Sequence, residues 1–516
     1  MNKKSLISLS ILTLIILLGA FLRFYNLDYL PMEMYGDIIE GYKFTEEILT
    51  GKWPFYFVLG NGPLFFYLVS ILAKIIGLSF LTMKITSSLV GIAIIFTTYL
   101  LGKEVFDEET GLIAAFLMAV SKWPLIFSRL GNMPILVTLF SSVIFYFTFK
   151  ISRKSNKWLD WILLAVLLGL GFYIYPAFFI LPLAVFVFFI FQGISFIKNN
   201  LIHELVLGLI FLLCAFPFGK ILMKNPASWF GSSSYFGSKI FVTEGKVASD
   251  WPIRFVTNVR KTVLMFFTNG DPGFRSNPPG QPAIDILSRL FLLTGIAFGF
   301  IDRKNRKNTF LLIQSSFLVM LPSILVLNVP SDVPNMGRTV GVIPLIFLLV
   351  ANGLIAPCRI SFVKKFLSNN IRYLILILLL TIILRLNFIH YFRDYSYHLP
   401  NHNEGFPRLI AEEIDKLPQK TNIIMVDSNW ADWGQPDWRA VYYEMKSKKT
   451  FKYFENKDFT CQLNDNIQSK YFILNPTSNV NLKMIENCLP GGNILIHYSP
   501  KYKFPVFISY YLGQPK

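Results

Sequence analysis

Charged side chains that could do chemistry lie in polar segments between the apolar runs of this 516-residue chain. Asp37 follows the first apolar run and opens a stretch in which apolar residues recur at helical spacing. The first turn of a helix favours the charged form of a carboxylate, so Asp37 could act as a general base at the membrane face. The alternative is that Asp37 only caps the helix, as Asp commonly does.

A second polar segment, residues 220–283, is strongly basic, and Arg338 stands at the start of a later apolar run. Arginine can hold a phosphate through two parallel hydrogen bonds, so these residues could bind an anionic group. The alternative for each of them is a contact with solvent or with lipid headgroups. The basic residues of the segment are Lys220, Lys224, Lys239, Lys246, Arg254, Arg260, Lys261 and Arg275.

The composition indicates a helical membrane protein. Hydrophobic residues make up 53% of the chain and charged residues only 16%, whereas soluble globular chains carry about 25% charged residues. The N-terminal apolar run is followed by no cleavage site of small residues, so we expect it to remain as the first span. The net charge of +18 is typical of basic cytoplasmic loops, and without a nucleic-acid-binding motif it predicts no nucleic-acid partner.

The apolar runs predict an all-α polytopic membrane domain with about eleven spans. The shorter run 63–77 contains Lys74 and predicts an interfacial or re-entrant helix instead. If it spanned the membrane, the basic loops 150–157, 302–308 and 359–372 would all lie outside, against the positive-inside rule. The predicted spans are 5–22, 83–101, 111–127, 133–150, 158–174, 176–193, 203–219, 284–301, 309–327, 338–356 and 372–389.

These spans predict a transmembrane domain of residues 1–389 with outer loops 23–82 and 220–283. The N-terminus is then cytoplasmic, and residues 390–516 form an extracytoplasmic domain at the plasma (inner) membrane.

The C-terminal domain is expected to be a small α/β fold, with a helix at 404–417 and strands at 422–427, 471–475 and 493–498. Cys461 and Cys488 could pair in an oxidising compartment or stay as free thiols. No spacing of Cys or His indicates a metal site.

An ordered set of motifs resembles the GT-C fold glycosyltransferases. Within that class the set is similar to the protein-mannosyltransferase and aminoarabinose-transferase group with its bacterial relatives. The resemblance covers most of residues 1–350 and implies transfer of a sugar from a polyprenyl phosphate to an extracytoplasmic acceptor. The matching stretches include YGDIIEGY, ILTGKWPF, GPLFFYLVSILAKIIG, GLIAAFLMAVSKWPLIFSRLG, and the stretches at 270–295 and 329–349.

The resemblance also implies roles for residues near the first spans. The family's general base is an acidic residue of the first outer loop, and Asp37 matches it. Family members often have Asp-Glu there, where this chain has Asp37-Ile38 with Glu40 nearby. Arg129 matches a recurring arginine, and Asn132 replaces an acidic residue of many members, which weakens metal-binding and two-carboxylate schemes.

Arg275 and Arg338 lie in matching stretches and are therefore expected to hold the donor phosphate, with Lys239 as a further candidate. Tyr42 could stack on a sugar or anchor the chain at the membrane interface. The residues expected to contact substrate are Glu40, Tyr42, Arg129 and Asn132.

The implied reaction is an inverting displacement. Asp37 takes the proton of the acceptor hydroxyl, and fixed cations stabilise the leaving lipid phosphate. The acceptor could be a protein, a lipid or a polysaccharide. No cofactor is expected, and dependence on a divalent metal stays open.

Two other readings stay open. A transporter or flippase for a lipid-linked or anionic substrate is the first, but few charges lie in the middle of spans. A non-catalytic assembly factor with a degenerate core is the second.

Overall fold

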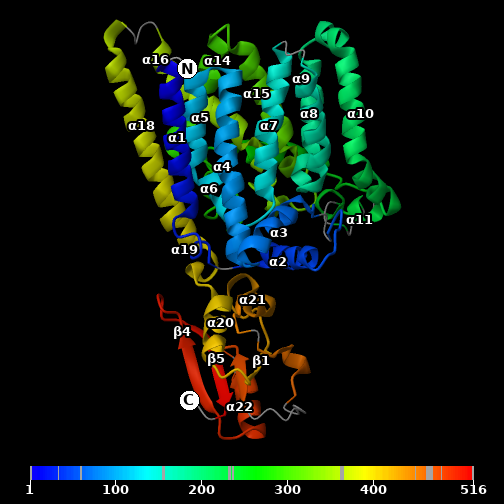
Figure 1. Ribbon diagram of the computed structural model, residues 1–516, viewed down its shortest axis with the longest axis vertical. Coiled ribbons are helices and arrows are strands. Elements are labelled where there is room, and N and C mark those ends of the chain that lie inside the picture. The colour runs from blue at the N-terminus through cyan, green and yellow to red at the C-terminus, as the bar shows by residue number, and fades with distance from the viewer. Residues whose placement is uncertain are drawn as a thin grey trace. The chain divides into compact units, whose positions relative to one another are not determined.

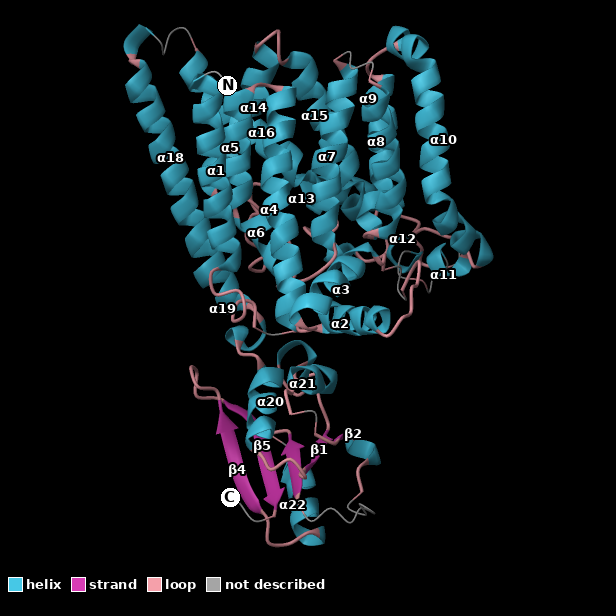
Figure 2. Ribbon diagram, in the orientation of Figure 1, coloured by secondary structure: helices cyan, strands magenta, loops and turns pink. Residues whose placement is uncertain are grey.

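Most of the chain is helical, and a small sheet forms near the C-terminus (Figure 1; Figure 2). The computed structural model describes residues 3–32, 34–57, 61–153, 157–230, 234, 237–243, 245–360, 365–447, 449–460, 469–477 and 479–513. The chain divides into two compact units. The first unit contains Met1–Leu27 and Phe44–Ser396, and the second contains Asp28–Lys43 and Tyr397–Lys516.

Helices occupy all the apolar runs of the first unit. Within the described residues, six helices are long and apolar enough to cross a membrane, or up to seven if α5 and α6, bent by 55°, form one span. The count of eleven spans stays a prediction, because several predicted spans correspond to shorter apolar helices. The apolar runs form the helices α1 (Lys3–Phe24), α4 (Phe80–Val105), α5 (Glu108–Val120), α6 (Lys122–Arg129), α7 (Pro134–Ser152), α8 (Trp158–Leu170), α9 (Leu181–Ile190), α10 (Ile194–Lys224), α14 (Ile286–Ile301), α15 (Arg306–Ile324), α16 (Ile343–Arg359) and α18 (Asn369–Ile389).

Glycines allow the central helices to approach closely. A Cβ atom at Gly295 of α14 would lie 1.9 Å from the carbonyl oxygen of Leu349 on α16. A Cβ atom at Gly353 of α16 would lie 2.0 Å from the carbonyl oxygen of Phe291. Small residues at such crossings are typical of membrane helices, whose association depends on close backbone packing. Helix α16 is almost wholly buried, whereas α10 and α18 expose most of their apolar side chains, as suits helices that face lipid.

Shorter helices lie in the segments between these helices. The predicted amphipathic helix is α2 (Gly36–Leu49), and the predicted helix at 63–77 is α3 (Leu64–Ile76). Both runs are helical as predicted, and the flanking glycines and prolines mark their ends: Gly51 and Gly77 have positive φ angles, and Pro63 precedes α3. The interfacial or re-entrant position of α3 stays a prediction. The remaining helices are α11 (Ala227–Phe230), α12 (Gly237–Ile240), α13 (Trp251–Leu264), α19 (Ser396–His398), and the turns η2 (Gly171–Tyr173), η3 (Pro176–Ile180), η4 (Pro330–Asp332), η5 (Val340–Val342) and η6 (His390–Tyr395).

The second unit is an α/β fold with a five-stranded sheet in the order β2-β1-β3-β5-β4. The first three strands in this order are parallel, and β5 runs antiparallel to β3 and β4. Successive side chains of β1 and β3 alternate between two cores, one beneath α20 and α21 and one beneath α22. The elements are β1 (Asn422–Val426), β2 (Phe451–Phe454), β3 (Lys470–Leu474), β4 (Asn493–Tyr498), β5 (Pro505–Leu512), α20 (Phe406–Lys416), α21 (Trp438–Glu444), α22 (Asn479–Cys488), and the turns η7 (Pro400–Asn403), η8 (Asp432–Gly434) and η9 (Asn456–Asp458).

The predicted helix and three strands of this unit are confirmed as α20, β1, β3 and β4. The sequence interpretation missed β2 and β5. Strand β2 is a half-buried run of four residues that includes Lys452, so it has little apolar pattern to reveal it. Cys461 lies outside the described residues, so the choice between a disulfide with Cys488 and free thiols stays open.

Candidate active site

Asp37 lies in the first turn of α2 and is exposed. The next two residues, Ile38 and Ile39, are buried at 1% exposure and anchor the opposite side of the helix turn. Amide groups of the first helical turn have few partners within the helix, which favours a negative charge there. Asp37 is therefore an accessible carboxylate on a fixed helix start, but its role as a base stays a prediction.

Glu40 and Tyr42, which the sequence suggested as substrate contacts, belong to the second unit and bind other residues of that unit. The Glu40 carboxylate accepts a hydrogen bond from Arg439, and Arg439 also pairs with Asp437 at 2.7 Å. The bond to Asp437, and after it the bond to Glu40, outweigh burial and raise the pKa of the Arg439 guanidinium. The buried Tyr42 ring stacks on Tyr443 with 4.1 Å between centroids. A contact of Glu40 or Tyr42 with substrate stays a prediction.

Lys239 and Arg338, far apart in the chain, meet at one carboxylate in the first unit. Lys239 Nζ of α12 lies 2.6 Å from Asp332 Oδ2, and Arg338 Nη2 lies 3.3 Å from the same oxygen. We call Lys239 and Arg338 the cation pair. Burial alone would raise the pKa of the Asp332 carboxyl, but the cation pair outweighs burial and holds that pKa below its ordinary value. Asp332 is therefore a stable anion that orients both cations.

The loop before Arg338 is fixed by a second, buried carboxylate. Asp271 Oδ2 accepts a hydrogen bond of 2.7 Å from the Met336 amide, and Oδ1 accepts one of 2.8 Å from the Gly273 amide. Asn335 Oδ1 accepts a further bond of 2.9 Å from the amide of Arg338 itself. Burial raises the pKa of the Asp271 carboxyl, although the bonds from the Gly273 and Met336 amides oppose the shift. The Arg338 backbone is thus held in place before any ligand binds.

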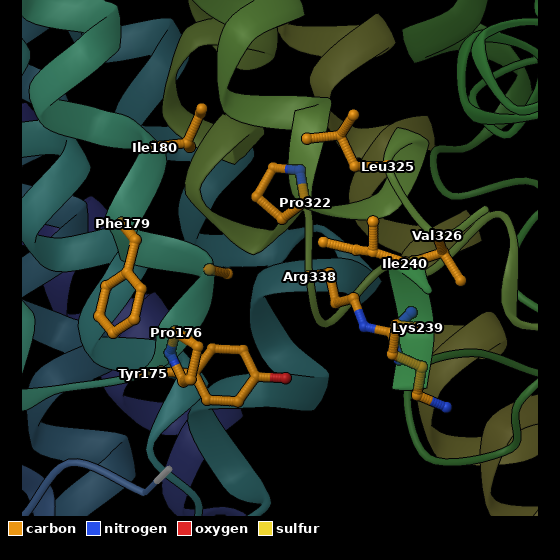
Figure 3. Close-up of a pocket in the computed structure, with 11 residues that line it drawn as sticks. Tyr175, Pro176, Phe179, Ile180, Lys239, Ile240, Pro322, Leu325, Val326 and Arg338 are labelled. Atoms are coloured by element: carbon orange, nitrogen blue, oxygen red, sulfur yellow. The ribbon is translucent and has the colours of Figure 1, made fainter. Parts of the chain in front are cut away.

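The cation pair lines an apolar cavity of about 220 Å³ in the first unit (Figure 3). In the view of Figure 3, the cation pair lies on the side opposite Pro176 and Phe179. Apolar walls beside two cations suit a molecule with a hydrocarbon part and an anionic group. The lining residues are Tyr175, Pro176, Ala177, Phe179, Ile180, Lys239, Ile240, Pro322, Leu325, Val326 and Arg338.

The sequence interpretation missed Asp332 and Tyr175. Asp332 belongs to the same SDVPNMGR stretch as Arg338, and Tyr175 stands before a proline between two apolar runs. These neighbours in the sequence could have marked both residues as candidates. Arg275 is exposed, and its carbonyl oxygen accepts a hydrogen bond of 3.2 Å from the Tyr395 hydroxyl. Its part in phosphate binding stays a prediction. Within the described residues, no group of three or more His, Cys, Asp or Glu side chains could hold a metal ion.

Arg129 is fully buried and binds the end of α1. Its Nη1 donates to the carbonyl oxygens of Leu22 and Arg23 at 2.7 and 2.8 Å, and its Nε donates to the Tyr391 hydroxyl at 2.8 Å. A guanidinium at a helix C-terminus satisfies carbonyl groups that lack partners in the helix. Asn132, largely buried, accepts a bond of 2.7 Å from the Met133 amide. These contacts favour positioning roles for both residues, and their substrate contact stays a prediction.

Replacing Arg129 by Gln is expected to lower the free energy of unfolding by about 3 kcal/mol, because several buried carbonyl groups lose a charged donor. Thermal unfolding of the purified protein in detergent checks this. The matched control is Arg393→Gln, which alters an exposed arginine and is expected to leave the midpoint unchanged. An Arg129→Gln variant that is as stable as wild type but inactive would instead indicate a substrate contact.

Comparison with known proteins bears on the fold. Residues 60–219 match the model of the family described as dolichyl-phosphate-mannose-protein mannosyltransferase. ArnT from Cupriavidus metallidurans bound to undecaprenyl phosphate is similar with a TM-score of 0.60 and 10% identity, over 99% of both chains. The apo state of ArnT gives a TM-score of 0.57 and 11% identity, over 95% of this chain and 97% of that one.

A third structure is the archaeal oligosaccharyltransferase AglB from Archaeoglobus fulgidus, in complex with an inhibitory peptide and a dolichol-phosphate. It is similar with a TM-score of 0.51 and 13% identity, over 100% of this chain and 75% of that one. The fold is that of the GT-C glycosyltransferases. The resemblance seen in the sequence motifs is thereby confirmed. No curated protein sequence matches the chain.

Proposed function

We propose that this protein is a membrane glycosyltransferase that moves a sugar from a polyprenyl phosphate to an acceptor outside the cytoplasm. The observation that carries the proposal is the apolar cavity of the first unit with the cation pair on its wall. A polyprenyl phosphate combines the two chemical features that this cavity matches, an isoprenoid chain and a phosphate. The GT-C fold of the chain supports the same class of reaction.

The phosphate would bind to the cation pair, which Asp332 already orients. Arg338 can donate two hydrogen bonds to phosphate oxygens, and Lys239 supplies a compact charge. These charges stabilise the leaving phosphate most when the bond to the sugar breaks, so they accelerate transfer as well as binding. Arg275 is proposed as a further phosphate contact from the outer loop. The solved relatives support this donor class, since one ArnT structure holds undecaprenyl phosphate and the AglB structure holds a dolichol-phosphate.

The transfer itself is proposed as one inverting displacement. An acceptor oxygen attacks the anomeric carbon, the bond between that carbon and the phosphate oxygen breaks, and Asp37 takes the proton of the acceptor hydroxyl. The new glycosidic bond then has the opposite anomeric configuration to the donor. Glu40, Tyr42, Arg129 and Asn132 are proposed as substrate contacts.

The proposed topology explains the choice of donor. The proposed chain has eleven spans in the plasma (inner) membrane, a cytoplasmic N-terminus and residues 390–516 outside. This topology would put Asp37 on the extracytoplasmic face. Nucleotide sugars are absent there, so the donor must be lipid-linked. The acceptor is a protein, a lipid or a polysaccharide of the envelope.

The test is sugar transfer by the purified full chain in detergent. Polyprenyl-phosphate hexoses and pentoses, radiolabelled in the sugar, are offered with crude envelope as acceptor. We expect label from one donor to enter the acceptor fraction with inverted anomeric configuration, read by linkage-specific glycosidases. Transfer with retained configuration would contradict the single displacement, and no transfer from any donor would contradict the proposed function.

A further inference from the structure

The segment that carries Asp37 is held by the C-terminal part of the chain. Residues Asp28–Lys43 belong to the second unit, although they directly follow the first helix in sequence. Asp28 Oδ1 lies 2.9 Å from Arg408 Nη2, and the Met32 amide donates a bond of 2.8 Å to Asn403 Oδ1. On the other side of Asp37, the Tyr42 ring stacks on Tyr443. The segment is therefore fastened on both sides of the carboxylate.

The fastening nearest to Asp37 is the contact between Glu40 and Arg439. Glu40 follows Asp37 by three residues in α2, so the two side chains lie on the same face of the helix. Arg439 Nη1 donates to Glu40, while its Nε and Nη2 donate to the two oxygens of Asp437 at 3.1 and 2.7 Å. Asp437 also accepts from the Arg439 amide at the start of α21, so the guanidinium is fixed in position and orientation.

We infer that Arg439, acting through Glu40, positions the Asp37 carboxylate for proton transfer. The C-terminal unit is then part of the catalytic apparatus as well as a separate fold. The inference rests on the proposed function, because it takes Asp37 to be the base. Helix α2 begins in the second unit and its last residues, 44–49, belong to the first, so Asp37 stands on an element that both units share.

The expected size of the effect follows from the geometry that a base requires. A general base must be within hydrogen-bond reach of the proton that it takes, and a displacement of about 1 Å can reduce the rate about 10²-fold. Arg439→Gln is therefore expected to lower kcat about 10- to 100-fold. The KM for the donor should stay constant, because the cation pair belongs to the first unit.

The test compares variants of the full chain in the transfer assay. Arg439→Gln and Glu40→Leu should lower kcat alike, and the double variant should be no worse than either single one, since both remove one interaction. Glu40→Gln, which keeps an acceptor oxygen for Arg439, should restore most of kcat. The matched control is Lys416→Gln, which breaks the exposed pair of Lys416 with Glu413 in the same unit.

Hydrogen exchange supplies a readout that does not depend on activity. In Arg439→Gln, exchange should rise in peptides from residues 28–43 and stay slow in β1 and β3. Unchanged kcat in an active protein overturns the inference, whether or not exchange rises. Additive losses in the double variant also overturn it. A wild-type chain that transfers no sugar overturns the proposed function instead, and raised exchange of 28–43 would then mark Arg439 as structural only.

Discussion

Replacement of Asp37 by Asn is expected to lower sugar transfer by about 10²- to 10⁴-fold, the usual contribution of a general base. The amide cannot take a proton from the acceptor hydroxyl, but it keeps the size and the hydrogen-bonding oxygen of the carboxylate. Helix α2 should therefore persist, because Ile38 and Ile39 stay buried. The measurement is the single-turnover rate at saturating donor, together with binding of polyprenyl phosphate, which should be unchanged.

The matched control for this experiment is Glu46→Gln, which changes another exposed carboxylate of α2. Its transfer rate should equal that of the wild type. If Asp37→Asn also transfers sugar at the wild-type rate, Asp37 only stabilises the start of the helix and the base lies elsewhere. If both variants lose activity, the net charge of the helix matters and not the position of one carboxylate.

Replacing either member of the cation pair is the second change for which we expect a large loss of activity with the donor. Arg338→Ala and Lys239→Ala are each expected to lower kcat/KM for the donor by about 10- to 100-fold, since a hydrogen bond to a charged group contributes about 1.5–3 kcal/mol. The dissociation constant of polyprenyl phosphate should rise in parallel, because the leaving group itself is the ligand. Titration of each variant with polyprenyl phosphate, followed by tryptophan fluorescence, measures that constant.

Two further variants test whether donor binding depends on the positions of Lys239 and Arg338 or only on the net charge of the basic segment. Lys246→Ala removes an exposed lysine of the same basic segment and should not alter donor binding. Arg338→Lys keeps the charge but loses the paired donors of the guanidinium, so it should recover only part of the affinity. Equal losses in Lys246→Ala and Arg338→Ala would show that the segment attracts the donor through overall charge, contrary to a specific site.

Local patterns in the sequence predicted much of the fold. Every predicted span coincides with at least part of a helix, since long apolar runs can satisfy their backbone groups in a membrane only as helices. Helices α2 and α3 were predictable because glycine and proline mark their ends. Strand β2 was not, because four half-buried residues carry no clear period. The pairing of residues 28–43 with the C-terminal unit was not predictable either, since it depends on contacts between distant parts of the chain.

The candidate site was predictable in its residue types but not in its arrangement. Lys239 was singled out by its charge and Arg338 by charge and resemblance, but the Asp332 carboxylate that joins them was missed. Ion pairs between distant loops leave no periodic signal in a sequence. For Arg129 the sequence predicted importance but not the role. Its match to a family arginine marked it as important, whereas its burial and its hydrogen bonds to α1, seen only in the structure, indicate a positioning role.

The cleavage of the glycosyl phosphate bond tests the central claim most directly. The wild-type chain is given a polyprenyl-phosphate sugar labelled separately in the sugar and in the phosphate, with an active envelope acceptor. We predict that free polyprenyl phosphate and glycosylated acceptor appear in equal amounts. A transporter gives a different result: in proteoliposomes the doubly labelled donor would cross the bilayer with its bond intact. That outcome, with no free polyprenyl phosphate in detergent, would contradict the account.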